Sequence, residues 1–526
     1  MKNFKKFTAT IAATLMAASL SVPMFASVPV GAADITITGI SESQAHTFEV
    51  YQVFTGDLSA GVLSNLKWGS GVAQYGANGV TPGSAVDEAI ITELTGITSN
   101  KGSDIVDKFT LSSTKACSDV TSSGDSVTIS GLADGYYIVK DVTNLGNVDD
   151  ANSAWIVQVA GNANIAIKNA KPTVDKQVVD ETGDAESGAS EGWGESADHA
   201  INESFQFKLK ATIPADNDLA AYETYKLVFN DTISAGVTFE SIASVKVGDT
   251  VISAYDADTA PYGYVVSGVS AGDSGKTWTM TIADLKKHVT NLSTGATVEV
   301  IYNAHLNENA VVHNSSAENT VDTNKNTVTL SYSNNPDSTG AGTTDGKTPE
   351  DTVWVFTYKV DNTKYKDSVA EGNKLAGAEF KLYESDGSTE VKLVYDNTKN
   401  AYRPATASET PTVMTSAEST GMFNIIGLDA GKYVLRETKT PDGYNTCADI
   451  DITIQAAHVE NAGGTSVNLN LTGSNNMNNS IINKSGSALP STGGIGTTLF
   501  YIGGGCMVGL AGIFLITKKR MGKKDE

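Results

Sequence analysis

Residues 427–437 read Gly-Leu-Asp-Ala-Gly-Lys-Tyr-Val-Leu-Arg-Glu, and residues 131–141 read Gly-Leu-Ala-Asp-Gly-Tyr-Tyr-Ile-Val-Lys-Asp. Both stretches begin with a glycine-bounded turn and continue into alternating apolar and polar residues, the pattern of a half-buried β-strand. Because the two stretches match position by position, the repeat predicts that the first and last domains of the chain share a fold.

Most of the chain between these copies has the same β character. Short alternating apolar runs are separated by Gly, Ser, Asn and Thr turns, and a helix is expected only at residues 84–94. This pattern predicts an all-β protein of three tandem immunoglobulin-like β-sandwiches. Turn-rich breaks at residues 169–172 and 336–349 separate them. The predicted domains are residues 33–169, 170–345 and 350–487.

The first 32 residues are expected to be a signal peptide. A lysine-rich start is followed by an apolar run at residues 7–20, and small residues precede Asp34. The alternative is a membrane anchor that stays attached. The apolar run is short and is followed by Pro23 and Pro29, which favours cleavage.

Residues 488–526 combine three signals. A pentapeptide precedes an apolar stretch at 495–516, which is long enough to span a membrane, and a basic tail follows. This order resembles the cell-wall sorting signal of Gram-positive surface proteins. The resemblance implies that sortase cuts after Thr492 and joins its carbonyl to an amine, so we expect transient membrane anchoring and then a cell-wall location on peptidoglycan. The pentapeptide is Leu489, Pro490, Ser491, Thr492 and Gly493.

The charge balance excludes some partners and cofactors. The formal net charge is −23, and removing the positively charged ends makes the exported part more negative, which argues against nucleic acid as a partner. Six scattered histidines and three cysteines offer no metal or cofactor site. Cys117 and Cys447 either pair or are small buried side chains.

The third domain resembles a Cna-B domain in three segments, residues 356–361, 375–383 and 433–444. The resemblance implies an amide between Lys359 on the first strand and Asn483 on the last, assisted by Glu437. Strand alternation independently turns Glu437 and Asn483 toward an apolar interior, where neutral Lys is nucleophilic and neutral Glu is a proton donor. Alternation alone leaves Lys359 ambiguous, so its assignment depends on the resemblance.

The middle domain has its own set of reactive residues. Lys176, Asp231 and Asn334 each follow alternating apolar residues on a predicted strand, so each points inward. Residues 171–176 and 332–336 resemble the middle domain of major pilins, which implies a Lys176–Asn334 amide assisted by Asp231. Strand parity favours Asn334 over Asn335. The simpler interpretation is a solvated lysine and an asparagine in a turn.

The first domain departs from this scheme. Asp141 occupies the repeat position of Glu437, but the early strand at residues 47–54 contains no lysine, so no internal amide is expected. After a strand that starts with Trp155, Lys168 resembles the lysine of pilins that accepts the next subunit, and Lys171 is the second choice. An ordinary linker lysine is the alternative.

Together these features resemble the sortase-assembled major (backbone) pilins of Gram-positive bacteria. The resemblance implies a structural shaft subunit joined head to tail to its own copies through Thr492 and Lys168, with minor pilins as further partners. Its only catalysis is expected to be formation of its own internal amides. The alternative is a monomeric wall-anchored adhesin that binds a host ligand. A third class, secreted hydrolases, is disfavoured because the protease-like segment at residues 272–275 is a small-residue turn.

Overall fold

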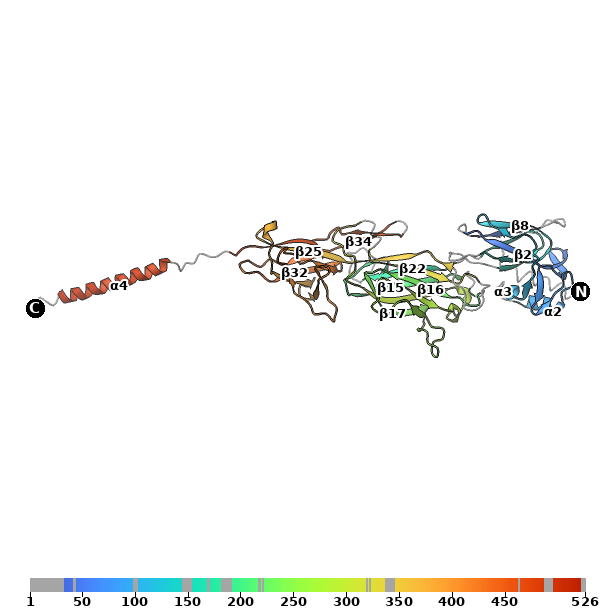
Figure 1. Cartoon of the computed structure of the whole chain (residues 1–526), viewed down its shortest axis with the longest axis horizontal. Coiled ribbons are helices and arrows are strands. Elements are labelled where there is room, and N and C mark those ends of the chain that lie inside the picture. Colours follow the sequence, from blue (N-terminus) through green and yellow to red (C-terminus); the bar gives the residue numbers. More distant parts are fainter. Residues whose placement is uncertain are drawn as a thin grey trace.

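The computed structural model is a row of three β-rich bodies followed by a separate helix (Figure 1). We refer to the three bodies as the first, second and third domains, in chain order. The structure describes these residues: 33–40, 44–97, 103–143, 154–167, 171–180, 192–215, 219, 222–317, 320, 323–335, 346–461, 464–486 and 495–521.

The first domain is built around the earlier copy of the repeat. Its main strands are β1 (Ala33–Thr38), β2 (Thr47–Ser59), β3 (Val62–Trp68), β7 (Val120–Thr121), β8 (Ser126–Leu132), β9 (Gly135–Asp141), β10 (Ala154–Val159) and β11 (Ala163–Ala166). They form a sheet ordered β11-β1-β8 and a second ordered β10-β9-β2-β3, with β7 beside β2. Alternating apolar side chains such as Ile35 and Ile37 are fully buried in the core that includes residues of both sheets.

A smaller sheet and two short helices enlarge this domain. They are β4 (Val72–Tyr75), β5 (Asn78–Gly79), β6 (Phe109–Leu111), α2 (Glu88–Gly96) and α3 (Ser103–Val106). The Asp87 side chain accepts a hydrogen bond from the Ala89 N–H and so caps α2. The helix expected at residues 84–94 is therefore present, shifted toward the C-terminus. A second apolar cluster, which includes Trp68 and Phe109, packs it to the domain.

The second domain is a two-sheet sandwich. One sheet contains β12 (Thr173–Asp180), β13 (Gly192–Gly194), β15 (Ser204–Ile213), β17 (Val237–Val247), β18 (Thr250–Val251) and β21 (Ala296–Leu306), ordered β13-β12-β15-β21-β17-β18. The other contains β14 (Ser196–Asp198), β16 (Leu227–Ile233), β19 (Val265–Ser267), β20 (Thr277–Ile282), β22 (Lys325–Tyr332), β23 (Gly346–Lys347) and β24 (Asp351–Phe356), ordered β14-β24-β22-β16-β20-β19 with β23 beside β22. Two 3₁₀ turns, η4 (Leu285–Lys287) and η5 (Leu292–Thr294), precede β21.

The third domain repeats the sandwich plan with a different strand order. One sheet contains β25 (Tyr358–Lys366), β28 (Leu393–Asp396), β29 (Ala401–Pro404), β31 (Ile425–Leu428) and β36 (Asn478–Asn483), ordered β28-β29-β31-β25-β36. The other contains β26 (Glu379–Glu384), β27 (Glu390–Val391), β30 (Met414–Thr415), β32 (Gly431–Lys439) and β33 (Ile450–Ile454), ordered β27-β26-β32-β33 with β30 beside β26. A hairpin of β34 (Ala457–Glu460) and β35 (Val467–Asn470) and the 3₁₀ turn η6 (Glu371–Asn373) complete it.

Strand β24 belongs to both of these domains. It pairs with β22 and β14 in a sheet of the second domain, so the predicted boundary at residue 350 assigns a strand of that sheet to the third domain. Val353 and Val355 pack in the core of the second domain, whereas Trp354 and Phe356 pack in that of the third. Because successive side chains of a strand point to opposite faces, one strand contributes to two cores.

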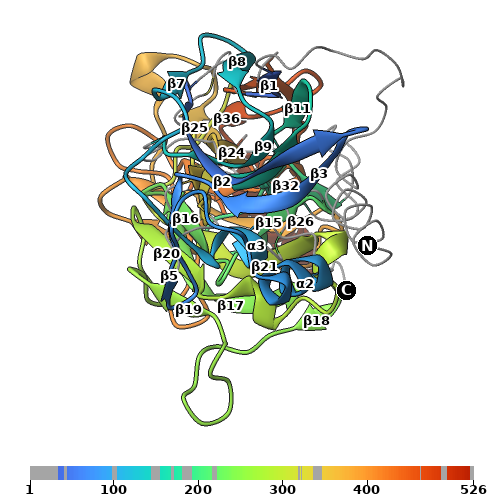
Figure 2. The ribbon, with the colours of Figure 1, turned by 90° about the vertical axis from the view of Figure 1, so that its right-hand side faces the viewer.

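Further contacts join the second and third domains next to β24. The Ile201 N–H donates to the Gly427 carbonyl at 3.0 Å, and the Leu469 N–H donates to the Ala317 carbonyl at 2.8 Å. Asp198 and His458 form a buried pair at 3.0 Å. Viewed from the end of the row, the domains overlap along one axis (Figure 2).

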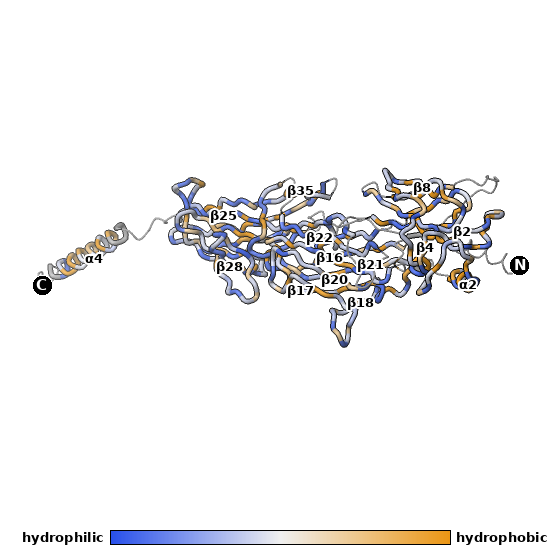
Figure 3. The backbone as a smooth tube through the Cα atoms, turned by 45° about the vertical axis from the view of Figure 1, so that its right-hand side comes forward, coloured by the Kyte–Doolittle hydropathy of each residue, from blue (hydrophilic) through white to orange (hydrophobic). Residues whose placement is uncertain are grey.

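The separate helix is α4 (Ile495–Met521). It contains a candidate membrane span at Leu499–Lys519 with a mean hydropathy of 2.1, and none of that span is buried against the protein. Figure 3 shows apolar residues along this helix, in contrast to the mixed colouring of the three domains.

Candidate functional site

Lys364, Asn483 and Glu437 meet inside the third domain. Lys364 lies on β25 and Asn483 on the neighbouring parallel strand β36, and the lysine Nζ donates a hydrogen bond to Asn483 Oδ1. Glu437 approaches from β32 in the other sheet: its Oε1 lies 3.4 Å from Lys364 Nζ and accepts a hydrogen bond of 2.7 Å from Asn483 Nδ2. All three residues are buried. An amine, an amide and a carboxyl group are therefore held in contact away from solvent.

The structure places Lys364, rather than the predicted Lys359, in this cluster. Lys359 points out of the sandwich: its side chain is 32 % exposed, and its Nζ pairs with Asp361 at 2.7 Å. Along β25 the inward positions include Val360, Asn362 and Lys364. Lys359 therefore faces the opposite side of the strand and lies five residues before Lys364. The Lys-Val-Asp match predicted a lysine of this strand, and the lysine beside Asn483 is Lys364, five residues further along.

Two other side chains border the cluster. The Cys447 backbone N–H donates to Glu437 Oε2 at 2.8 Å, and its Sγ lies 3.7 Å from Lys364 Nζ. Burial raises the pKa of the Cys447 thiol to about 11, so it remains protonated at neutral pH. The Phe380 ring centroid lies 5.2 Å from Lys364 Nζ. Cys117 belongs to the first domain, and both cysteines are free thiols rather than a disulfide.

In the second domain, Lys176 and Asp231 form a fully buried pair across the sandwich. Lys176 lies on β12 and Asp231 on β16 of the other sheet, and Lys176 Nζ contacts Asp231 Oδ2. Burial lowers the pKa of Lys176 and raises the pKa of Asp231. Both shifts favour transfer of the lysine proton to the carboxylate, which leaves a neutral, nucleophilic amine.

The amide at the level of Lys176 is that of Asn326, rather than the predicted Asn334. In β22, Val328 is the Cα partner of Asp231, and Asn326 lies two residues before it. Asn334 lies six residues beyond Val328, or about 20 Å along a strand. Asn326 is fully buried, and its Nδ2 donates to the Tyr302 hydroxyl. Both asparagines have the same strand parity, so parity predicted the correct face but could not give the level.

The first domain has a histidine at the corresponding place. Asp141, at the repeat position of Glu437, pairs with His46 Nδ1 at 2.6 Å, and both side chains are buried. Thr143 also donates its hydroxyl to Asp141 Oδ1 at 2.5 Å. An imidazole cannot form a Lys-type amide with asparagine. His46 was missed because it precedes the predicted strand and belongs to no motif.

The groups expected to react with sortase lie outside the described residues, as does the predicted signal peptide. These groups are Lys168, Leu489, Pro490, Ser491, Thr492 and Gly493. The neighbouring Ile167 is described: its N–H donates to the Thr38 carbonyl at 2.9 Å, so the position before Lys168 is fixed at the edge of the first domain. Lys171 is half-buried.

Other candidate sites are weaker. No group of three or more His, Cys, Asp or Glu residues suited to a metal ion occurs among the residues that the structure describes. The protease-like segment is a turn in which Gly272 and Gly275 have φ values of +90° and +62°, and Asp273 accepts a hydrogen bond from the Ser270 N–H.

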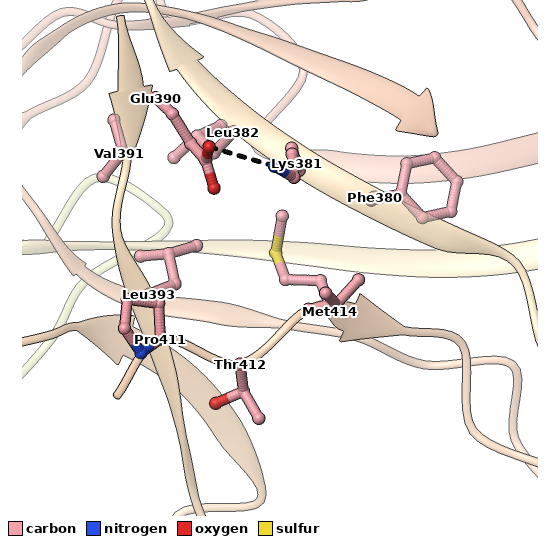
Figure 4. A pocket seen from close by; sticks show the side chains of 10 residues that line it. Phe380, Lys381, Leu382, Glu390, Val391, Leu393, Pro411, Thr412 and Met414 are labelled. Atoms are coloured by element: carbon pink, nitrogen blue, oxygen red, sulfur yellow. Dashed lines mark hydrogen bonds and ion pairs between the residues drawn. The ribbon is translucent and has the colours of Figure 1, made fainter. Parts of the chain in front are cut away.

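A small surface pocket lies in the third domain. It encloses about 190 Å³, and Lys381 and Glu390 pair at 3.0 Å beside Met414 on its wall (Figure 4). Phe380 lines the pocket, and its ring centroid lies 5.2 Å from Lys364 Nζ. Lys364, Glu437 and Asn483 themselves do not line the pocket.

Family models match three parts of the chain. Residues 201–336 match the Gram-positive pilin backbone subunit 2, Cna-B-like domain. Residues 360–466 match the SpaA prealbumin-like fold domain, and residues 481–521 match the LPXTG cell wall anchor motif. These matches confirm the resemblance to backbone pilins and the predicted cell-wall location. A comparison with curated proteins gave no match.

Solved structures of major pilins align with most of this chain. The T6 backbone pilin of serotype M6 Streptococcus pyogenes is 15 % identical with a TM-score of 0.51, over 89 % of this chain and 100 % of that chain. The full-length major pilin SpaD from Corynebacterium diphtheriae is 17 % identical with a TM-score of 0.45, over 87 % and 98 % of the two chains. The full-length major pilin RrgB from Streptococcus pneumoniae is 15 % identical with a TM-score of 0.40, over 86 % and 100 %. The T6 likeness confirms the predicted three-domain fold.

Proposed function

We propose that this chain, a Gram-positive pilin backbone subunit with a cell-wall anchor, is the shaft subunit of a covalent surface pilus whose second and third domains each contain an internal Lys–Asn amide. The observation that carries the proposal is the pair of buried clusters, in which a lysine and a carboxyl group contact each other and an asparagine amide lies at the same level. The chain is a substrate of sortase rather than an enzyme class of its own, and each internal amide forms once.

The two amides differ in what they join. Lys364 and Asn483 lie on adjacent parallel strands of one sheet, so their amide joins the first strand of the third domain to its last. Lys176 and Asn326 lie in opposite sheets, so their amide joins the two layers of the second domain. In each reaction the lysine Nζ attacks the asparagine Cγ, and the carboxyl group returns a proton to the departing ammonia.

Polymerisation requires an acceptor amine outside these clusters. Lys168 follows Ile167, which is fixed by its hydrogen bond at the edge of the first domain, and Thr492 follows the third domain. A bond between Thr492 of one copy and Lys168 of the next is head to tail and does not close, so it builds a filament. Further proposed partners are minor pilins and, at the base of the filament, peptidoglycan.

Intact mass spectrometry of the exported chain tests the internal amides. The parent should be lighter than its sequence by two ammonia molecules, because each amide releases one. Asn326→Ala should retain the ammonia loss of the third domain only, and its control Asn334→Ala should lose both ammonia molecules as the parent does. If Asn334→Ala loses only one and Asn326→Ala loses two, our assignment of the asparagine is wrong.

A detergent-gel ladder from cells that carry the pilus sortase tests polymerisation. Lys168→Ala should leave monomer on the wall and remove the high-mass ladder, whereas Lys171→Ala should keep it. A ladder that disappears only with Lys171→Ala would move the acceptor to Lys171. A parent chain that never forms a ladder in these cells would favour the monomeric adhesin instead.

A further inference from the structure

The two proposed amide sites use carboxyl groups of different length. In the third domain Glu437 Oε1 reaches both reacting groups directly, at 2.7 Å from Asn483 Nδ2 and 3.4 Å from Lys364 Nζ. Aspartate is one methylene shorter. Among the described residues, the side-chain partners of Asp231 are Lys176, Trp278 and Tyr302, and the asparagine is not one of them. The second domain therefore needs another route for a proton from Asp231 to Asn326.

The Tyr302 hydroxyl occupies the space between these groups. It donates a hydrogen bond of 3.1 Å to Asp231 Oδ1 and accepts one from Asn326 Nδ2. Its oxygen also lies 3.4 Å from Lys176 Nζ. One hydroxyl thus contacts the acid, the nucleophile and the nitrogen that must leave.

The position of Tyr302 is fixed by its surroundings. The residue is fully buried on β21, and its ring centroid lies 5.2 Å from that of Trp278, 5.3 Å from that of Phe207 and 5.7 Å from that of Phe239. Trp278 Nε1 donates to Asp231 Oδ1 at 3.0 Å, which orients the same carboxyl group. These contacts aim the hydroxyl at the reacting atoms rather than leaving it free to rotate away.

We propose that Tyr302 is a catalytic residue of the second domain that relays a proton from Asp231 to the amide nitrogen of Asn326. This inference rests on the proposed function, because it concerns how the Lys176–Asn326 amide forms. It explains why an aspartate suffices in the second domain while the third domain has the longer Glu437.

The protons balance as follows. Lys176 Nζ starts with three protons, passes one to Asp231 and attacks Asn326 Cγ through its free electron pair. As the Nζ–Cγ bond forms, Nδ2 loses its conjugation and becomes basic. Asp231 then donates to the Tyr302 oxygen while the Tyr302 hydroxyl proton moves to Nδ2, the Cγ–Nδ2 bond breaks, and ammonia leaves. Asp231 takes a second proton from Nζ, so the product is an amide N–H beside a protonated carboxyl group.

The test compares amide formation in the two domains of one full-length chain. Parent and Tyr302→Phe are made by cell-free synthesis, and digested samples are analysed by mass spectrometry over time for the loss of ammonia from each domain. Tyr302→Phe keeps the aromatic ring and its packing, so we expect the second-domain amide to form about 100-fold more slowly or worse, as for loss of a general acid. The third-domain amide should form at the parent rate and so provides an internal control.

A second substitution separates a relay from a packing role. Asp231→Glu in the Tyr302→Phe chain adds the missing methylene, so the carboxyl group can reach Asn326 directly and amide formation should be restored at least in part. If Tyr302→Phe does not fold, 3,5-difluorotyrosine at position 302 keeps the ring and hydroxyl but makes the hydroxyl more acidic. The relay then predicts a changed rate in the second domain alone.

The outcomes distinguish the relay from the function on which it rests. If the parent loses no ammonia from the second domain, the proposed amide itself is absent. If the parent forms the amide and Tyr302→Phe forms it equally fast, or the fluorinated chain shows an unchanged rate, Tyr302 is not a relay. A slow Tyr302→Phe chain that Asp231→Glu does not accelerate would assign Tyr302 to packing and overturn the relay.

Discussion

At the scale of single residues, Lys176 shows why an internal amide suits a buried site. Its amino group is fully buried, faces Asp231, and lies 5.3 and 5.5 Å from the ring centroids of Phe207 and Tyr302. Removing one partner of a buried ion pair typically destabilises a protein by about 3–5 kcal/mol, because a desolvated charge remains. Amide formation removes the lysine charge altogether and lets the carboxyl group stay neutral. The reaction therefore relieves an electrostatic penalty as it creates a crosslink.

Lys364→Ala and Lys359→Ala form a matched pair for the third domain. Lys364→Ala should abolish one ammonia loss and lower the Tm of that domain, because the proposed amide closes a loop between residues 119 apart in sequence. Closing a loop of about 100 residues contributes about 4–5 kcal/mol in the chain-entropy model. Lys359→Ala removes an exposed lysine on the same strand and should leave mass loss and Tm close to those of the parent. Calorimetry with intact mass spectrometry checks both, and equal Tm values for the two variants would contradict the assignment.

Strand alternation predicted the inward face for Glu437, Asn483, Lys176 and Asp231 but left the lysine of the third domain ambiguous, and it could not give the position of a residue along its strand. Asn326 lies on β22 and Asn334 lies two residues beyond its end with the same parity, and the pairing of Asp231 with Val328 identifies Asn326 as the one beside Lys176. Register depends on partners far away in sequence, which a local pattern does not contain. Glu437 and Asn483 were predicted because the resemblance to a Cna-B domain implied both residues and strand alternation turned both of them inward.

At the scale of elements, the first glycine of the repeat has the same backbone conformation in both copies but different surroundings. Gly131 and Gly427 both have positive φ values, +83° and +76°, which glycine adopts without strain. Around Gly131 nothing lies within 4 Å of an added Cβ, whereas at Gly427 the added atom would be 2.4 Å from Ile201 Cδ1. The turn at Gly131 therefore has space for a Cβ, whereas the turn at Gly427 is part of the contact between the second and third domains.

Gly427→Ala should weaken that contact more than a backbone effect alone would. Gly131→Ala introduces the same type of φ strain without a clash, so it serves as the control. Gly427→Ala must in addition displace Ile201, and we expect faster amide hydrogen exchange at Ile201, whose N–H bonds to the Gly427 carbonyl. Hydrogen exchange measured by mass spectrometry checks this. Unchanged exchange at Ile201 in Gly427→Ala would show that the interface adjusts at no cost.

Glu195 lies between β13 and β14, and its titration should make the stability of the protein depend on pH. Burial, followed by the negative charges of Asp351, Asp175 and Glu460, raises the pKa of Glu195 to about 8 from 4.5. Since the folded state holds this proton more tightly, the associated stability is complete below about pH 4.5 and is lost as the pH rises toward about 8. Glu195→Gln cannot ionise and should exceed the parent in Tm at pH 8.5 but match it at pH 4.

A control for this pH effect is Glu371→Gln. The Glu371 side chain is 96 % exposed, so its substitution should change the Tm little at either pH. Thermal melts of the three chains across this range measure the difference directly. A Glu195→Gln chain whose Tm differs from the parent by the same amount at pH 4 and pH 8.5 would rule out the titration of Glu195 as the cause.

At the scale of the whole molecule, the proposed amides make the second and third domains closed loops, whereas the first domain remains an open chain. Composition and alternation predicted three sandwiches in a row, and the row in Figure 1 agrees. They could not predict that β24 is shared, because its run of apolar residues is the same whether one core or two surround it. The position of the domain boundary therefore depends on tertiary packing, which the local sequence pattern does not contain.

A cut inside a closed loop tests this topology. The connection between β18 and β19 projects from the second domain (Figure 2), and Tyr255 and Tyr262 in it are more than half exposed. A specific protease site placed there should be cleaved without separating the two pieces on a denaturing gel, since the Lys176–Asn326 amide still joins them. The same site in Lys176→Ala should yield two bands. Two bands from the parent would mean that no amide spans the cut.

In the proposed filament, the shared strand β24 would carry the tension that passes from one subunit to the next. Tension would enter a subunit at Lys168, cross from Lys176 to Asn326, and later cross from Lys364 to Asn483 on its way to Thr492. The first domain would lie outside the path of the tension. Within the second and third domains, the amides would carry the tension in place of most of the chain. The stretch from Asn326 to Lys364 has no bypass, and β24 lies within it, hydrogen-bonded to β22 and β14 and packed into two cores. Pulling along β24 would load these hydrogen bonds together, in shear, so we expect the force that extends this stretch of the proposed filament to depend on them.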